Sequence, residues 1–350
     1  MSFGAKPFPH GDLDTTASDT VSFRQVSGVI VSVRQTAISS PGKSGHSEFY
    51  KIASQPGVTT YGAKTTVRGK LKCVERNKMN TQYEIGVIGA GNAAEGIVHG
   101  ILRNSVLFDD RMIASDPAES RRTVFADRFH IAVTDDNRHL VENSYILILA
   151  VKPQLFAEVC EGFADLVRED HLIVSIMAGV STKSIESRFP KVQPRVVRTM
   201  PNLPVHVGAG MAGICKGRFA QEVDLLRAQR IFDAGGRSIV IQDEALMDAV
   251  TAVSGSGPAY FYFFVEALTA AGVDAGLSIQ QAGILAKQAC LGAARMMLES
   301  GDSPAALREK VMSPGGTTEA AMESMAENNV FEHLKSGFLA AWKRSQSLGK

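Results

Sequence analysis

The chain has 350 residues, about twice the common size of a single domain, so two domains are expected and a mini-protein is excluded. Lys and Arg total 37 against 36 Asp and Glu, a formal net charge of +1, which offers no global electrostatic attraction to nucleic acid or to an anionic membrane. The four cysteines, Cys73, Cys160, Cys215 and Cys290, stand singly without a C-x-x-C pair, which argues against a zinc site or a disulfide framework and favours a reducing, cytoplasmic location.

Residues 1–78 differ in composition from the rest of the chain. Eighteen of them are Ser or Thr, eleven are Lys or Arg and five are Asp or Glu, and no stretch keeps a helical apolar period for long. We therefore expect a poorly ordered leader that takes no part in catalysis. Three origins stay open: a flexible extension, an organelle-targeting peptide, or translated sequence upstream of a true start at Met79. Against a targeting peptide, which contains few acids, stand Asp12, Asp14, Asp19 and Glu48.

Between residues 84 and 244, short apolar segments alternate with helical ones. Expected strands cover 85–88, 112–115, 145–151, 172–176 and 195–198, and two more, at 210–215 and 238–242, flank a helix at about 219–233. Nearly continuous apolar strands separated by helices are typical of a parallel sheet that is covered on both faces. The pattern predicts a doubly wound α/β domain over residues 79–244.

The first expected strand runs directly into a glycine-rich turn, Gly89-Ala90-Gly91-Asn92-Ala93-Ala94, which opens a helix ending near Asn104. In a dinucleotide-binding turn, the first glycine permits the tight bend, the second lets the backbone approach the pyrophosphate, and a small third residue lets the helix pack closely on the strand. Free N–H groups at the helix start then face the anion. The turn predicts a dinucleotide site, with a purely structural glycine turn as the alternative.

The second expected strand ends at Ser115 and Asp116, where the adenosine ribose of a dinucleotide should lie. An acid at this position usually accepts a hydrogen bond from the ribose 2′-hydroxyl and repels a 2′-phosphate, whereas Ser115 can donate to that phosphate. These two residues leave the choice between NAD and NADP open.

Signatures of several other enzyme classes are missing from the sequence. It holds no Tyr-x-x-x-Lys pair and no G-x-S-x-G elbow, and its eight His residues show neither H-x-x-x-H nor H-x-H spacing. Short-chain dehydrogenase, serine hydrolase and metal chemistry are therefore not expected.

Residues 245–350 carry no strand signal and are expected to be helical throughout. The segment 259–273 is apolar almost all round, broken chiefly by Glu266. A helix without a polar face must be buried on all sides, and a domain of this size is small to surround it, so we expect a second subunit to supply part of the cover. A central helix in a monomeric bundle is the alternative. No apolar run approaches the ~18 residues that a membrane span needs.

A second glycine-rich loop, Ser313-Pro314-Gly315-Gly316-Thr317-Thr318, lies between two of these helical segments. Backbone N–H groups at a helix N-terminus, together with Thr hydroxyls, bind a carboxylate or a phosphate. An interhelical turn punctuated by Pro and Gly is the alternative.

Taken together, the motifs resemble those of the pyrroline-5-carboxylate reductase family in their order and spacing. The resemblance covers about residues 83–345 and implies an NAD(P)-binding Rossmann domain followed by an all-helical dimerisation domain of the 6-phosphogluconate-dehydrogenase C-terminal type, at 245–350. It rests on five segments: Gly89 to Ala94, AVKPQ at 150–154, MPNLP at 200–204, SGSGPAY at 254–260, and Ser313 to Thr318.

The resemblance also implies positions for the cofactor and the substrate. The sequence departs from the family pattern at three positions: Met177 and Leu203, which bear on the shape of the pocket, and Asp116, which bears on the cofactor preference. The pyrophosphate would lie on Ile88, Gly89, Ala90, Gly91, Asn92 and Ala93; the ribose or its phosphate near Ser115, Asp116, Pro117 and Asn137; the nicotinamide against Ala150, Val151, Lys152, Pro153 and Ala178; and the substrate carboxylate on Ser313, Gly315, Gly316, Thr317 and Thr318.

The implied reaction is the reduction of 1-pyrroline-5-carboxylate to L-proline, the last step of proline biosynthesis, with NADPH as the main reductant and NADH usable. Thr318, beside the imine nitrogen, is the catalytic candidate. Two alternatives stay open: a 3-hydroxyacid-type dehydrogenase, for which Lys287 is the only reasonable acid-base group, and a non-catalytic NAD(P)-binding regulator. We expect a homo-oligomer and no nucleic-acid, membrane or metal partner.

Overall fold

The computed structural model describes residues 19–26, 29–36 and 81–348; the first two ranges belong to one unit of the chain and the third to another. In the first unit, β1 (Asp19–Val26) pairs antiparallel with β2 (Val29–Thr36), a hairpin that the sequence analysis does not predict. The rest of the expected leader lies outside the described residues.

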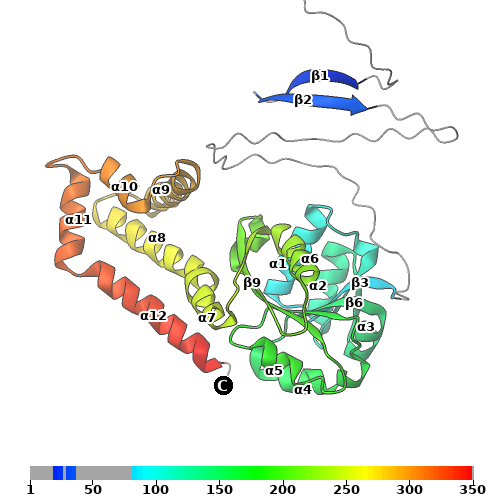
Figure 1. Ribbon diagram of the computed structural model, residues 1–350. Coiled ribbons are helices and arrows are strands. Elements are labelled where there is room, and N and C mark those ends of the chain that lie inside the picture. Colours follow the sequence, from blue (N-terminus) through cyan, green and yellow to red (C-terminus); the bar gives the residue numbers. More distant parts are fainter. Residues whose placement is uncertain (1–18, 27–28, 37–80, 349–350) are drawn as a thin grey trace, which may run out of the picture. The chain divides into compact units, whose positions relative to one another are not determined.

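The second unit contains an eight-stranded sheet in the order β10-β9-β8-β7-β6-β3-β4-β5 (Figure 1). The expected α/β fold is confirmed, with one unpredicted strand, β5. The strands are β3 (Tyr83–Ile88), β4 (Met112–Ser115), β5 (Ala132–Thr134), β6 (Ser144–Leu149), β7 (Leu172–Ser175), β8 (Arg195–Met200), β9 (Gly210–Lys216) and β10 (Gly236–Val240).

The sheet is not parallel throughout, because β9 runs antiparallel to β8 and β10 follows the direction of β9. Only a short 3₁₀ turn, η4 (Leu203–Val207), and the left-handed Gly208 connect β8 to β9. A parallel pair needs a crossover of a dozen or more residues, so this short connection can only return antiparallel.

Helices cover both faces of the sheet, and each face has its own apolar core. On one face pack α1 (Asn92–Arg103), α2 (Glu119–Phe129) and α6 (Glu222–Asp233). On the other pack α3 (Asn137–Asn143), α4 (Phe156–Glu161) and α5 (Thr182–Glu186). Strands that are buried on both sides explain the continuous apolar runs in the sequence.

His171, at the start of β7, is fully buried in this core. Its Nδ1 accepts a hydrogen bond from the backbone N–H of Arg168 at 3.1 Å, while its Nε2 has no partner. Burial, with a smaller contribution from the charge of Arg168, lowers the pKa of His171 to about 4. The imidazole is therefore neutral in the folded protein at physiological pH.

We expect the protein to lose stability between pH 6.5 and 4. In this window His171 of the unfolded chain binds a proton that the folded protein excludes. The free energy of unfolding therefore decreases by up to about 3 kcal/mol as the pH is lowered from 6.5 to 4. Asn at this position keeps an acceptor but does not titrate, so His171→Asn should lose less stability over this range. Urea unfolding of both proteins at pH 7.5 and 5 tests this; parallel losses would contradict it.

Beyond η5 (Glu244–Leu246) every element is helical, as expected. A short helix, α7 (Met247–Val250), continues into a π-helical turn, η6 (Thr251–Gly255). The five helices that follow are α8 (Gly257–Asp274), α9 (Ile279–Glu299), α10 (Pro304–Lys310), α11 (Thr317–Glu327) and α12 (Val330–Leu348).

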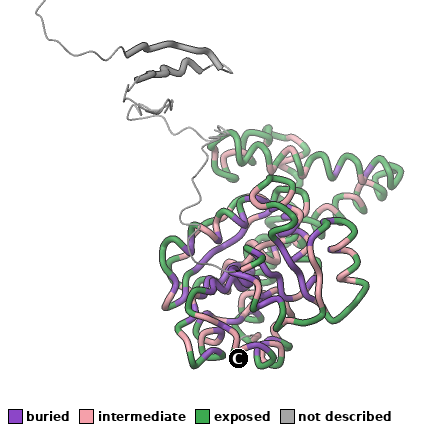
Figure 2. Tube along the Cα trace, turned by 90° about the vertical axis from the view of Figure 1, so that its right-hand side faces the viewer, coloured by how far each residue is buried: buried purple, intermediate pink, exposed green. Residues whose placement is uncertain are grey.

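The predicted apolar helix α8 is uncovered in the single chain. Only Gly257 is buried in it, and Phe261, Tyr262, Phe263 and Phe264 are 47–67% exposed. Figure 2 shows the contrast between the purple sheet core and the mostly green and pink helical region. A central helix of a monomeric bundle does not fit these exposures. Among the described helices, none is long and apolar enough for a bilayer-spanning segment.

Candidate functional site

Four loops meet at the carboxyl edge of the sheet. In the strand registers, Ile88 lies opposite both Ser115 and Leu149, and Leu149 lies opposite Ser175. The residues that follow these strands therefore lie side by side along this edge. The chain order reverses between β3 and β6, and open α/β sheets bind ligands at this kind of switch point.

Gly89 and Gly91 have different reasons to be glycine. Gly89 has a φ of +96°, and a Cβ there would lie 2.8 Å from the carbonyl oxygen of Ala150, so the fold itself requires glycine. A Cβ on Gly91 would meet no protein atom within 4 Å. Because Gly91 is the N-cap of α1 and has no side chain to cap the helix, the first N–H groups of α1 are available to an anion. These features fit a pyrophosphate.

Asp116 ties the glycine turn to the next loop. Its Oδ2 accepts from the backbone N–H of Ala90 and its Oδ1 from that of Ala118, both at 2.9 Å. The Ala90 N–H is thus taken by a side chain of the protein. Ser115 is buried, and its hydroxyl donates to Oδ1 of Asn137 at 2.6 Å, so two expected ribose residues contact each other.

Two arginines that the sequence analysis did not single out lie at this ribose end. Arg121 donates to the carbonyl oxygen of Ala90 at 2.6 Å and pairs with Glu95 at 2.9 Å. Arg122 donates to the carbonyl oxygens of Asp116 and Pro117 at 2.8 and 2.9 Å. Glu95 neutralises part of the Arg121 charge, so Arg122 brings the larger share of positive charge to this edge. The signal available in the sequence was this pair of consecutive arginines in the helix that follows the second strand.

The expected nicotinamide segments follow β6 and β7. The backbone N–H of Ala150 donates to Ile88, and that of Ile176 donates to Leu149, which joins the two segments to the glycine turn. Met177 is 2% exposed and belongs to the apolar core, so its side chain fills the core and not a surface cleft. Lys152, which precedes the 3₁₀ turn η2 (Pro153–Leu155), is exposed.

The second glycine-rich loop forms a tight turn before α11. Gly315 has a φ of +71°, and the N–H of Gly316 donates to the carbonyl oxygen of Ser313 at 2.8 Å. The N–H of Gly315 donates to Glu319 at 2.6 Å. Two expected donors to a substrate are thus engaged within the loop. The first N–H groups of α11, at Thr317 and Thr318, carry no side-chain cap.

The structure brings the expected cofactor-binding residues together at one edge of the sheet but does not join them to this loop. Among the described residues, no hydrogen bond or ion pair connects Ser313 to Thr318 with the carboxyl edge of the sheet. A different link exists between the two regions, through Asn202. Its amide nitrogen donates to the carbonyl oxygen of Ser254 at 3.1 Å, and its Oδ1 accepts from the N–H of Met211 at 2.8 Å.

Asn202 thereby joins the MPNLP segment to the SGSGPAY segment, a contact that the sequence analysis missed. Both segments were part of the resemblance, but nothing in their spacing says that they touch. The receiving residue, Ser254, lies in the π-helical turn η6, a geometry that is frequent at functional sites.

The two buried thiols of the sheet domain are not nucleophiles at neutral pH, and the described residues offer no metal centre. Burial raises the pKa of Cys160 to about 12 and that of Cys215 to about 11, so neither thiol is ionised at neutral pH. Within the described ranges, no group of three His, Cys, Asp or Glu side chains is placed to hold a metal ion. The arrangement is suited to binding and aligning a dinucleotide.

Two family models match the chain. Residues 84–179 match the family of coenzyme F420-dependent NADP oxidoreductases, and residues 244–348 match the pyrroline-5-carboxylate reductase dimerisation family. The first match contains the glycine turn and the second contains α8 and the Ser313 to Thr318 loop.

Similar proteins carry the same family name. The pyrroline-5-carboxylate reductase of Pseudomonas aeruginosa is 40% identical over 76% of this chain and 97% of its own, and that of Pisum sativum is 37% identical over 77% and 97%. Two solved structures, each aligned over 77% of this chain and 100% of its own, are similar. They are the Coxiella burnetii reductase (35% identity, TM-score 0.71) and the Plasmodium falciparum reductase with NADP bound (27%, 0.70). The chain belongs to the pyrroline-5-carboxylate reductase family.

Proposed function

We propose that the protein reduces 1-pyrroline-5-carboxylate to L-proline, the last step of proline biosynthesis, with NADPH as the main reductant and NADH as a usable one. The observation that carries this proposal is the pairing of an uncapped glycine turn on a Rossmann sheet with an uncapped, glycine-rich helix start in the helical region. The first suits a pyrophosphate and the second suits a carboxylate.

The nicotinamide cofactor, when bound, supplies the hydride. The protein binds the cofactor and the substrate, orients them toward each other and keeps water out of the site. Gly89 to Ala93 would hold the pyrophosphate, and Ala150 to Pro153 with Ala178 would lie against the nicotinamide. The N–H groups of Thr317 and Thr318 would hold the substrate carboxylate, while the Thr318 hydroxyl donates to the imine nitrogen. The product amine needs one proton on nitrogen besides the hydride on carbon, and the Thr318 hydroxyl would relay that proton to the imine nitrogen from water.

An assay of cofactor oxidation tests the proposal against its two alternatives. Purified protein should oxidise NADPH with 1-pyrroline-5-carboxylate, and not with a 3-oxo acid or with no substrate. Turnover with the 3-oxo acid alone would favour the 3-hydroxyacid-type dehydrogenase, and absence of turnover with either would favour the regulator. Lys287 lies exposed on α9.

The proposed preference for NADPH rests on the amide nitrogen of Asn137 and on the two arginines, because the Ser115 hydroxyl is engaged with Asn137. Asp116 opposes the preference. We expect Asp116→Ser to lower the ratio of the KM for NADPH to that for NADH by roughly fivefold, because removing a like charge near a phosphate is worth about 1 kcal/mol. Losing the hydrogen bond to Ala90 should weaken the binding of both cofactors equally, so the ratio of the two KM values reports the effect of the charge alone. An unchanged ratio would mean that Asp116 only holds the two loops together.

We also propose a homodimer or a larger homo-oligomer, formed through the helical region with α8 in the interface. A cytoplasmic location is proposed from the isolated cysteines, of which Cys160, Cys215 and Cys290 are free thiols in the described part of the chain.

A further inference from the structure

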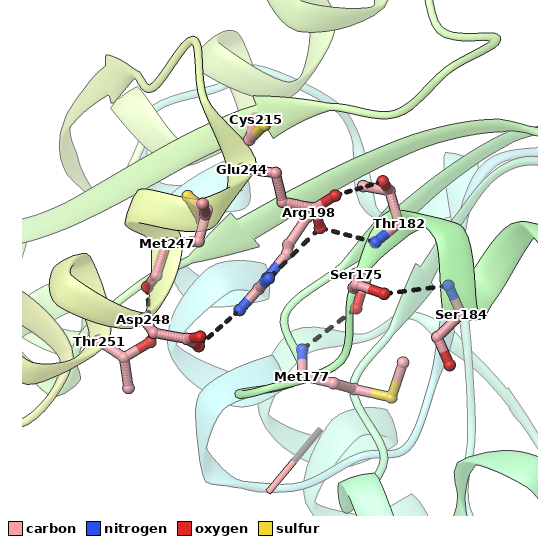
Figure 3. A network of polar contacts seen from close by, with 12 residues as sticks. Ser175, Met177, Thr182, Ser184, Arg198, Cys215, Glu244, Met247, Asp248 and Thr251 are labelled. Atoms are coloured by element: carbon pink, nitrogen blue, oxygen red, sulfur yellow. Dashed lines mark hydrogen bonds and ion pairs between the residues drawn. The ribbon is translucent and has the colours of Figure 1, made fainter. Parts of the chain in front are cut away.

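A buried arginine on β8 bridges the sheet and the start of the helical region. Arg198 is 4% exposed, and its guanidinium donates to Oε1 of Glu244 at 3.3 Å and to Oδ1 of Asp248 at 3.2 Å (Figure 3). Arg198 lies in the sheet, Glu244 begins η5, and Asp248 lies in α7. One side chain thus fixes two successive elements of the connection to the helical region.

The two carboxylates extend the bridge in opposite directions. Glu244 accepts from the backbone N–H of Thr182 at 2.7 Å and from its hydroxyl at 2.6 Å. Asp248 accepts from the hydroxyl of Ser345 at 2.8 Å, and Ser345, near the end of α12, is only 2% exposed. We call these five residues the Arg198 network: Thr182, Arg198, Glu244, Asp248 and Ser345.

The Arg198 network contacts segments that lead to both halves of the proposed site. Thr182 begins α5, four positions after Ala178 of the nicotinamide segment. Asp248 stands just before the π-helical turn that receives Asn202. Ser345 anchors α12, which also packs on α7 and follows α11, the helix that the substrate loop opens.

Stability alone is a weak reason for such a group. Two carboxylates and one guanidinium lose most of their hydration here, and their mutual attraction offsets only part of that cost. Apolar side chains of similar volume in the same place often stabilise a folded protein as well or better. What directional, charged hydrogen bonds add is a defined geometry. Here the defined geometry is the placement of the helical region on the sheet.

We propose that Arg198 is a positioning residue for hydride transfer: acting through Glu244 and Asp248, it sets how the helical region, with its substrate loop, is oriented on the cofactor-binding sheet. The inference rests on the proposed function. The inference applies whichever subunit of an oligomer supplies the substrate loop. The helical regions of the subunits would form one interface, so a tilt of one region would also move the loop of the other. A displacement of about 1 Å at the reacting atoms can cost up to 100-fold in rate, so a small tilt is sufficient to slow turnover.

The test compares Arg198→Lys and Ser345→Ala with a matched control, Arg195→Lys. Arg195 lies on the same strand and pairs with the buried Asp224 at 3.0 Å, but both partners belong to the sheet domain. We expect Arg198→Lys to reduce kcat roughly tenfold and Ser345→Ala to reduce it less, with NADPH affinity by fluorescence titration unchanged. The deuterium isotope effect on kcat with 4-deuterated NADPH should rise, because hydride transfer becomes slower relative to other steps.

Arg195→Lys should lower the melting temperature without changing kcat or the isotope effect. The inference is overturned if Arg198→Lys and Ser345→Ala, assayed below their melting temperatures, keep the wild-type kcat and isotope effect, or if Arg195→Lys changes both equally. A wild-type protein that does not reduce 1-pyrroline-5-carboxylate would instead overturn the proposed function. Ser345→Ala keeps the test open if Arg198→Lys fails to fold, because it removes one hydroxyl and leaves the ion pairs in place.

Discussion

Replacing Phe263 with Asp should separate the proposed oligomer into folded, inactive monomers. Phe263 lies in the middle of α8 and is 67% exposed within its own chain, so the substitution does not touch the core of the monomer. In the oligomer, the same side chain would lie against a second subunit. The change therefore acts on association and leaves folding of the single chain largely unaffected.

The expected effect on association is large. Burying the exposed part of a Phe side chain contributes about 2 kcal/mol, and an unpaired carboxylate in its place costs several more. A two-fold interface contains each substitution twice. A loss of at least about 4 kcal/mol corresponds to a roughly thousandfold weaker dissociation constant.

Sedimentation velocity over a range of concentrations, with an activity assay on the same samples, measures this. The control is Phe108→Asp, the same substitution at a Phe that is 75% exposed in the sheet domain, which should keep the wild-type sedimentation coefficient. A wild-type protein that sediments as a fully active monomer would contradict the interface. So would a Phe263→Asp protein that stays oligomeric.

The local fold of the expected cofactor half could be predicted because its signal is local. An apolar strand, a glycine-rich turn and an amphipathic helix are contiguous from Tyr83 to Arg103, and their sequence pattern dictates their geometry. The uncovered face of α8 is local too, since a helix without a polar side must find cover. These features needed no knowledge of distant contacts.

What could not be predicted depends on contacts between distant residues. The antiparallel direction of β9 follows from its short connection to β8. The residues of β9 themselves are equally compatible with a parallel and an antiparallel strand. Asp116 reads as a ribose ligand from its place at a strand end, but the structure directs both its oxygens to backbone N–H groups. The partners of Arg198 stand 46 and 50 positions away, and no periodicity relates such residues.

Glu319 is a second contact that the sequence pattern does not predict, within the proposed substrate loop. The pattern offers the N–H groups of both glycines to a substrate, yet Glu319 occupies that of Gly315 and the turn itself uses that of Gly316. The backbone at the start of α11 and the hydroxyls of the loop, that of Thr318 among them, are left for an incoming ligand. We therefore expect the orientation of the substrate to depend more on Thr318 than on the glycine N–H groups.

Thr318→Ala should depress turnover of 1-pyrroline-5-carboxylate about five- to 150-fold, the equivalent of roughly 1–3 kcal/mol for one hydrogen bond at the reacting centre. The backbone N–H groups that would hold the carboxylate stay in place, and so does the distant glycine turn. NADPH binding, measured by fluorescence titration, should therefore be nearly unaffected. Thr318→Ser keeps the hydroxyl and should restore most of the turnover.

Lys287→Ala distinguishes this reading from the hydroxyacid-type alternative. A dehydrogenase of that type uses a helix lysine as its acid-base group, so the variant would lose activity there, whereas an imine reductase that relies on Thr318 should be unaffected. Steady-state kinetics of the three variants with both substrates gives the comparison. If Lys287→Ala abolishes turnover and Thr318→Ala is silent, the hydroxyacid-dehydrogenase alternative gains and the imine-reductase proposal fails.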